Sequence, residues 1–168
     1  EQAYVVVDIE TTGGQKNNHR ITEVAAIKVV NGQEVARWHS LINPQRHIPK
    51  FIKDLTGIDN AMVAQAPTFA EQAHSLWQFL QGAIFVAHNV NFDYGFIRAE
   101  MARTQRNLIL PKLCTVRLAR KYLPNHQSYS LAKLCKELEI DLHGHHRAMN
   151  DAQATVDLFA LIQTKRQQ

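Results

Sequence analysis

Residues 4–14 have the sequence YVVVDIETTGG, and this stretch decides the fold. The run of valines predicts a buried strand that ends in two carboxylates. Because side chains alternate between the two faces of a strand, Asp8 and Glu10 point to one face and Ile9 points to the other. Two like charges this close repel each other unless a positive charge lies between them. The end of the strand therefore requires a cation from elsewhere.

Four further strands are predicted along the chain. Residues 21–30 and 33–43 predict an antiparallel pair, because Asn31-Gly32 between them is a strong hairpin turn signal. Residues 83–88 and 108–114 predict two more strands, which alternate with helices. A hairpin followed by this alternation implies an α/β fold with a central mixed five-stranded sheet flanked by helices.

The predicted helices follow from capping signals and apolar spacing. Thr68 and Glu71 form a capping box at the start of a helix, and Gly82 ends that helix. Its apolar stripe contains Phe69, Ala73, Leu76, Trp77 and Leu80. The other predicted helices are a short one between Pro49 and Leu55 and longer ones over residues 91–105, 116–123, 130–140 and 148–165.

The composition fits one folded domain over residues 1–168, because 45% of the residues are hydrophobic and 20% are charged. No apolar run approaches the roughly 20 residues of a membrane span, and no secretory signal is visible. The chain starts at Glu1 rather than Met, as expected for a domain cut from a longer chain. Cys114 and Cys135 lie far apart and outside any CxxC pair, so we expect reduced thiols in a cytoplasmic protein. The net charge of +4 fits an anionic partner such as nucleic acid.

Two more acids lie where helices are predicted to begin. Asp93 in AHNVNFDYGF and Asp151 in HHRAMNDAQAT both fall in a first helical turn. Helix capping alone would explain each of them, because the helix dipole favours a carboxylate there. If both converge on Asp8 and Glu10, four carboxylates need cations, and all-oxygen ligands favour Mg²⁺ or Mn²⁺ over Zn²⁺. Two such ions about 3.5–4 Å apart serve phosphoryl displacement.

His146 lies five residues before Asp151. On one helix the two side chains would point about 140° apart, so we expect His146 to precede the helix on a loop. A neutral imidazole there is suited to take a proton from an attacking water. The alternative is that His143, His145 and His146 form a solvated polar loop. A zinc site is less favoured, because no thiolate lies near with ligand spacing.

The motifs DIETTG, HNVNFD and HRAMND, in this order and spacing, resemble the three motifs of the DEDDh exonuclease family. The proofreading epsilon subunit of bacterial DNA polymerase III typifies that family. The resemblance covers the chain from Tyr4 to about Ile162. The stretches LINPQRHIPKFIKDLTGI and KLCTVRLARKYLPNHQSYSLAKLC further resemble DnaQ-type exonuclease domains that some bacteria fuse to a UvrC-like nuclease domain.

The resemblance implies a ribonuclease H-like fold and a metal-dependent 3′→5′ exonuclease. Such an enzyme hydrolyses single-stranded DNA to nucleoside 5′-monophosphates in proofreading or repair, with two Mg²⁺ or Mn²⁺ ions. The metal-binding acids of the family match Asp8, Glu10, Asp93 and Asp151. The general base matches His146, because the H-x4-D spacing selects it over His145.

The resemblance also implies contacts to the substrate at Thr11, Thr12, Leu55, Thr56, Asn89 and Phe92. Leu55 belongs to the segment that wedges against the last base, and Phe92 matches an aromatic contact to the 3′ strand. Each has an alternative role, since Leu55 and Phe92 fit a core and Asn89 fits a helix cap. Glu23 is interpreted as structural, because a buried carboxylate needs a partner of its own.

The expected partners are the 3′ end of single-stranded DNA and either a DNA polymerase subunit or a fused nuclease domain, with no membrane contact. Arg117, Arg120 and Lys121 are candidates for contacting the nucleic-acid backbone, and a solvated helix face is the alternative. Two other functions stay open. One is an RNA-directed 3′–5′ exoribonuclease of the same family, and the other is a non-catalytic module that binds nucleic acid or a polymerase.

Overall fold

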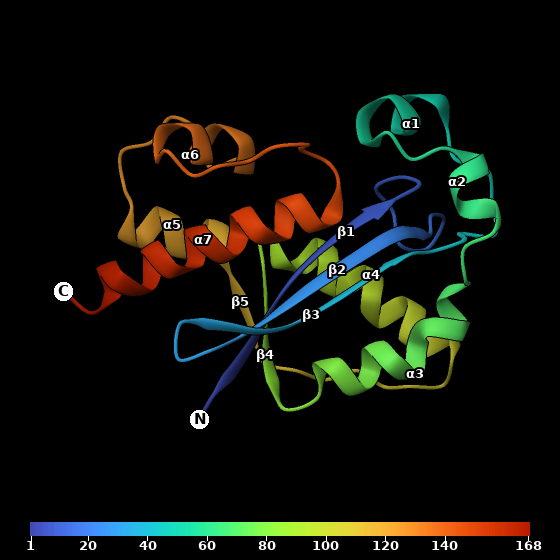
Figure 1. Ribbon diagram of the computed structural model, residues 1–168, viewed down its shortest axis with the longest axis horizontal. Coiled ribbons are helices and arrows are strands. Elements are labelled where there is room, and N and C mark those ends of the chain that lie inside the picture. The colour runs from blue at the N-terminus through green and yellow to red at the C-terminus, as the bar shows by residue number, and fades with distance from the viewer.

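The computed structural model describes residues 1–168, in which helices cover both faces of a five-stranded sheet (Figure 1). The strands are β1 (Ala3–Thr11), β2 (Ile21–Val30), β3 (Gln33–Leu41), β4 (Ala83–Ala87) and β5 (Lys112–Cys114). They lie in the order β3-β2-β1-β4-β5. The first three are antiparallel neighbours, β4 is parallel to β1, and β5 is parallel to β4. The mixed five-stranded sheet predicted from the sequence is therefore confirmed.

Seven helices accompany the sheet: α1 (Lys50–Thr56), α2 (Asn60–Ala64), α3 (Phe69–Leu80), α4 (Val90–Arg103), α5 (Thr115–Tyr122), α6 (Leu131–Glu137) and α7 (Ala148–Arg166). The predicted capping box of α3 is present, with Thr68 and Glu71 each accepting from the other's backbone N–H. The helix α2 was not predicted. Asp59 begins it by accepting a hydrogen bond from the Met62 N–H, which is a cap within a very short segment.

Two strands are shorter than predicted by more than one residue. β3 ends at Leu41. The Ile42 N–H still donates to the Thr22 carbonyl oxygen of β2, but the Asn43 N–H then donates to the Pro67 carbonyl oxygen. β5 begins only at Lys112. Before it, the hydroxyl group of Tyr94 forms hydrogen bonds with the backbone of residues 108–110. It donates to the Leu108 carbonyl and accepts from the Leu110 N–H. In both places a long-range contact replaces the sheet pairing.

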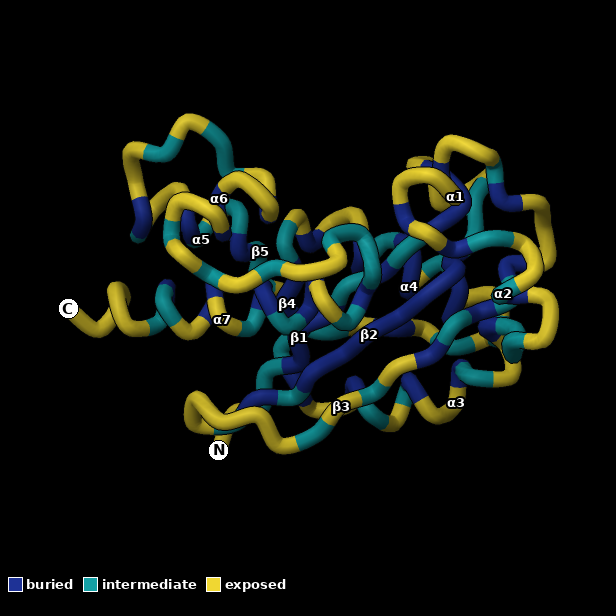
Figure 2. The backbone as a smooth tube through the Cα atoms, turned by 45° about the horizontal axis from the view of Figure 1, so that its top comes forward, coloured by how far each residue is buried: buried dark blue, intermediate teal, exposed yellow.

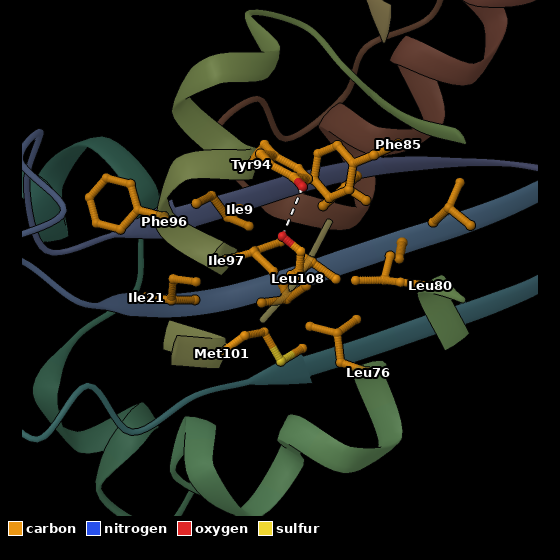
Figure 3. Packing of buried hydrophobic residues seen from close by; sticks show 14 of the residues in the cluster. Ile9, Ile21, Leu76, Leu80, Phe85, Tyr94, Phe96, Ile97, Met101 and Leu108 are labelled. Atoms are coloured by element: carbon orange, nitrogen blue, oxygen red, sulfur yellow. Dashed lines mark hydrogen bonds between the residues drawn. The ribbon is translucent and has the colours of Figure 1, made fainter. Parts of the chain in front are cut away.

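The alternation of side chains along β1 separates the residues that pack in the largest hydrophobic cluster from the two carboxylates. Val5, Val7 and Ile9 belong to the largest hydrophobic cluster, where they pack with residues of α3 and α4 (Figure 3). Val6 lies on the other face and packs against Phe159 of α7. Asp8 and Glu10 share that second face, so the strand presents its carboxylates on the side of the sheet that α7 covers.

The central strands are buried and the edge strand β3 is largely exposed (Figure 2). Burial of β1 on both faces explains its near-continuous apolar run. None of the helices has the length and apolar character needed to cross a membrane.

Candidate active site

The C-terminal end of β1 places the carboxylates of Asp8 and Glu10 beside each other. The Oδ2 atom of Asp8 is buried and has no hydrogen-bond partner. Burial, and then the charges of Asp93 and Asp151, raise the pKa of Asp8 well above its usual value. Burial and the carboxylates of Asp151 and Glu23 raise the pKa of Glu10 to about 9. Both groups thus resist ionisation where no cation is near.

Asp93 and Asp151 reach this place from opposite sides of the sheet. Asp93 lies in the first turn of α4, is 4% exposed, and accepts a hydrogen bond from the Ile9 N–H at 3.1 Å. Asp151 lies in the first turn of α7 and is also 4% exposed. Burial is the main cause that raises the pKa of each. The predicted convergence of the four acids is therefore present.

Three of the four carboxylates form the tightest group. One oxygen each from Asp8, Glu10 and Asp151 lies within 4.8 Å of the other two. Asp93 stands beside this trio, close enough for its charge to raise the pKa of Asp8. Oxygen ligands at this spacing, one of them buried without a partner, are the donor set of a hard divalent cation. The residues present fit the metal that the sequence predicts.

Two histidines border the acids from the loop before α7. His146 precedes the helix, as predicted, in a left-handed backbone conformation with φ of 71°. Its N–H donates to Asp151 Oδ2 at 3.0 Å. His145, which the spacing argument set aside, lies with Nδ1 2.8 Å from Asp151 Oδ1, and its ring stacks on that of His146 at a centroid distance of 3.6 Å. Burial and His145 lower the pKa of His146, although Asp151 opposes this.

Glu23, which was interpreted as structural from the sequence, fixes this loop through partners that the sequence did not reveal. It faces Glu10 across the β1–β2 ladder and is 1% exposed. Arg147 donates to it twice, from Nε at 3.1 Å and from a terminal nitrogen at 3.0 Å, and the Ala148 N–H donates at 2.9 Å. His39 lies 2.7 Å from the same carboxylate. Burial opposes ionisation of Glu23, but these hydrogen bonds outweigh it and hold its pKa below the usual value.

Replacing Glu23 should harm metal binding although Glu23 is outside the acid trio. In Glu23→Gln the guanidinium of Arg147 loses its ionic partner and is free to pair with Glu10, because its charge already offsets part of the rise in the pKa of Glu10. We expect the midpoint of a Mg²⁺ titration, followed by calorimetry, to rise at least about tenfold, equivalent to about 1.4 kcal/mol. The double variant Glu23→Gln/Arg147→Gln should recover most of that affinity, because the competing cation is gone. A midpoint that stays unchanged in Glu23→Gln would contradict this competition.

The candidate substrate contacts divide into exposed and buried groups. Leu55 is 51% exposed and Phe92 is 37% exposed, so neither is a core residue. Asn89 is exposed and occupies the N-cap position of α4 without a side-chain cap, which removes the capping explanation. The side chains of Thr11, Thr12 and Thr56 are buried and hydrogen-bonded to neighbouring backbone atoms. The hydrogen bonds stabilise the backbone around the three threonines, whose contacts to the substrate stay a prediction.

The comparisons with known proteins agree with this geometry. Residues 5–159 match the family model described as Exonuclease. The chain is 40% identical over 172 residues to the 3′-5′ exonuclease DinG of Bacillus subtilis. The alignment covers 100% of this chain and 18% of that protein. It is 38% identical over 168 residues to the PolC-type DNA polymerase III of Caldanaerobacter subterraneus, covering 100% of this chain and 12% of the polymerase.

A Mycobacterium tuberculosis protein named "Putative bifunctional exonuclease/endonuclease" is 42% identical over 173 residues, covering 97% of this chain and 27% of that protein. The chain therefore spans between 12% and 27% of the length of these three relatives. Among solved structures, Exonuclease X in complex with 5′ overhanging duplex DNA is 28% identical with a TM-score of 0.75. The alignment covers 96% of this chain and 91% of that one.

Proposed function

This chain belongs to the exonuclease family, and from that premise we propose that it hydrolyses single-stranded DNA from the 3′ end and releases nucleoside 5′-monophosphates. The observation that carries the proposal is the set of acids on β1, α4 and α7, with an unpartnered oxygen of Asp8 among them. The 3′-5′ direction is supported by the name of the DinG relative, and DNA as the substrate by the PolC and Exonuclease X relatives.

Members of the family depend on metal ions, and we propose that this chain uses two ions, Mg²⁺ or Mn²⁺. Asp8, Glu10, Asp93 and Asp151 would hold them. When bound, the ions supply positive charge that favours deprotonation of water and stabilises the leaving 3′ oxygen. The four carboxylates would become stable in their ionised forms once that charge is present, because opposite charge lowers a carboxyl pKa.

His146 is proposed as the general base. Its imidazole accepts the proton of the water that attacks the terminal phosphorus, and the bond from phosphorus to the 3′ oxygen breaks. Asp151 orients this residue by accepting its backbone N–H. The lowered pKa of His146 keeps the imidazole neutral, and therefore able to accept a proton, at neutral pH.

The exposed side chains beside the acids would hold the substrate. Leu55 and Phe92 offer apolar surface to the terminal bases, and Asn89 offers an amide to the strand. Thr11, Thr12 and Thr56 support the backbone around them. The relatives in polymerase and bifunctional nuclease chains support a polymerase or a fused nuclease domain as partner. The two free cysteines, Cys114 and Cys135, support a cytoplasmic location.

A labelled oligonucleotide tests the proposed activity. A 5′-labelled single-stranded DNA, incubated with the protein and Mg²⁺ or Mn²⁺, should yield a ladder that shortens from the 3′ end. EDTA and the Asp151→Ala variant should each abolish the ladder, because EDTA removes the metal ions and the substitution removes one of their proposed ligands. An RNA of the same sequence, run in parallel, should be degraded more slowly. Faster loss of the RNA would identify an exoribonuclease, and no ladder on either strand would reject the enzyme proposal.

A further inference from the structure

A groove on the solvent side of α4 carries positive charge that no acid neutralises. It consists of three adjoining depressions, one between the β1–β2 loop and the start of α4, one along α4, and one between α4 and α5. Asn91 lines all three, Lys16 is shared by the first two, and Lys112 is shared by the last two. We name this continuous surface the α4 groove.

Five cations line the α4 groove: Lys16, Arg98, Lys112, Arg117 and Arg120. All five are exposed, and none belongs to an ion pair of the structure. No Asp or Glu lines any of the three depressions. The arginines nearby differ, since Arg20 and Arg103 both pair with Glu100. The charge of the groove is therefore available to an anionic ligand.

The two connecting lysines of the groove lie against α4. The Nζ atom of Lys112 lies 3.4 Å from Asn91 Oδ1 and 4.8 Å from the centre of the Tyr94 ring. The side chain of Lys16 lies 3.5 Å from the position that a Cβ atom on Gly95 would take. Lys112 is placed by its neighbours, so less of its side-chain entropy is lost when it binds a ligand.

The α4 groove begins beside the acids. Phe92, which lines the first depression, directly precedes Asp93 on α4, and its ring is partly exposed. An exposed aromatic side chain offers a stacking surface to a nucleic-acid base. Asn89, at the start of the same helix, lines the third depression. A strand whose 3′ end lies at the acids can thus continue directly into the groove.

We propose that the α4 groove binds the backbone phosphates of a single-stranded nucleic acid on the 5′ side of the reacting end. The inference rests on the proposed exonuclease function, because that function places a 3′ end at Asp93. Unpaired cations beside an exposed aromatic ring are the arrangement that binds single strands without regard to sequence. The groove makes the affinity depend on strand length and salt, whereas the acids perform the chemistry.

The salt dependence of binding tests the groove. Affinity for a 5′-fluorescein dT12 is measured by anisotropy in EDTA, over a range of KCl concentrations. If all five cations contact phosphates, the slope of log K against log[KCl] should be about −3.5 in the unchanged protein, from roughly −0.7 per contact. The triple variant Arg98→Gln/Lys112→Gln/Arg117→Gln should reduce the slope to about −1.4. The matched control Lys133→Gln/Lys165→Gln/Arg166→Gln removes the same charge from exposed residues outside the groove and should leave the slope unchanged.

A small substrate separates the groove from the catalytic site. Hydrolysis of the p-nitrophenyl ester of thymidine 5′-monophosphate in Mn²⁺ needs the acids but no strand, so the groove variant should keep the rate of the unchanged protein. Equal loss of oligonucleotide affinity in the groove and control variants would overturn the groove proposal. So would an unchanged slope in the groove variant. If the unchanged protein hydrolyses neither the ester nor DNA, the proposed function fails, and the anisotropy slopes still decide whether the groove binds.

Discussion

Asp8→Asn is expected to abolish exonuclease activity and, at the same time, to raise the melting temperature of the metal-free protein. Activity should fall by at least about a thousandfold, because the loss of a proposed central metal ligand removes several kcal/mol of charge stabilisation. Stability should rise because Asp8 Oδ2 is buried and unpartnered among like charges. For a chain of this size, each kcal/mol released raises the melting temperature by about 2–4 °C.

The stabilisation should depend on pH with a definite sign. The folded protein raises the pKa of Asp8 above its unfolded value of about 3.9. The neutral carboxyl is therefore tolerated at low pH, and stability is lost as pH rises through the folded pKa. Accordingly, Asp8→Asn should match the unchanged protein near pH 3.5 and exceed it increasingly at higher pH. Thermal melts in EDTA at each pH measure this difference.

Metal and a surface variant provide the controls. Millimolar Mg²⁺ or Mn²⁺ should raise the melting temperature of the unchanged protein by mass action and have little effect on Asp8→Asn. The same chemical change at the exposed Asp141 should alter neither activity nor the melting temperature. If Asp8→Asn lowers the metal-free melting temperature, Asp8 supports the fold, and the proposed metal site has to be reconsidered.

His146→Ala is expected to reduce kcat by about 10²–10⁴-fold, the usual contribution of a positioned general base. The pH profile should identify the residue as well. Burial and the neighbouring His145 hold the pKa of His146 below its ordinary value near 6.5. Activity of the unchanged protein should therefore be constant at neutral pH and decline on the acid side of 6.5, as the imidazole becomes protonated. The measurement is kcat on the nucleotide ester between pH 4.5 and 9.

His145→Ala is the informative comparison, because His145 is the histidine whose side chain contacts Asp151. We expect it to lose less activity than His146→Ala and to retain the acid limb. His146→Ala should lose that limb together with its rate. If the pattern is reversed, so that His145→Ala shows the larger loss and a flattened profile, the general base is His145 and the spacing argument selected the wrong neighbour.

The sequence was informative wherever the decisive interactions are local. The alternation of Asp8, Ile9 and Glu10 assigned each side chain to a face, and the Thr68 capping box marked the start of α3. The position of His146 before its helix also follows from helical periodicity, once His146 and Asp151 are both required at one site. Such features involve residues a few positions apart, so the backbone geometry alone constrains them.

Features that depend on distant partners were missed or left undecided. The short β5 follows from the contact of Tyr94 with residues 108–110, and the ionic partner of Glu23 lies 124 residues away at Arg147. The side chain of His145 was set aside because its spacing to Asp151 differs from the family motif, yet it contacts that residue. The sequence offered one signal that Arg147 belongs to the site, since Arg147 directly follows His146 in a motif that also contains Asp151.

By itself, therefore, the sequence determined the α/β fold, the strand that carries the first two acids, and the candidates for the other two. Only the tertiary structure decided that Asp8, Glu10 and Asp151 form the tight trio, that Arg147 is held by Glu23, and that the cations of α4 and α5 line one groove. The reason is physical. A side chain's neighbours in sequence fix its direction, but its electrostatic environment depends on which elements the order of the sheet brings together.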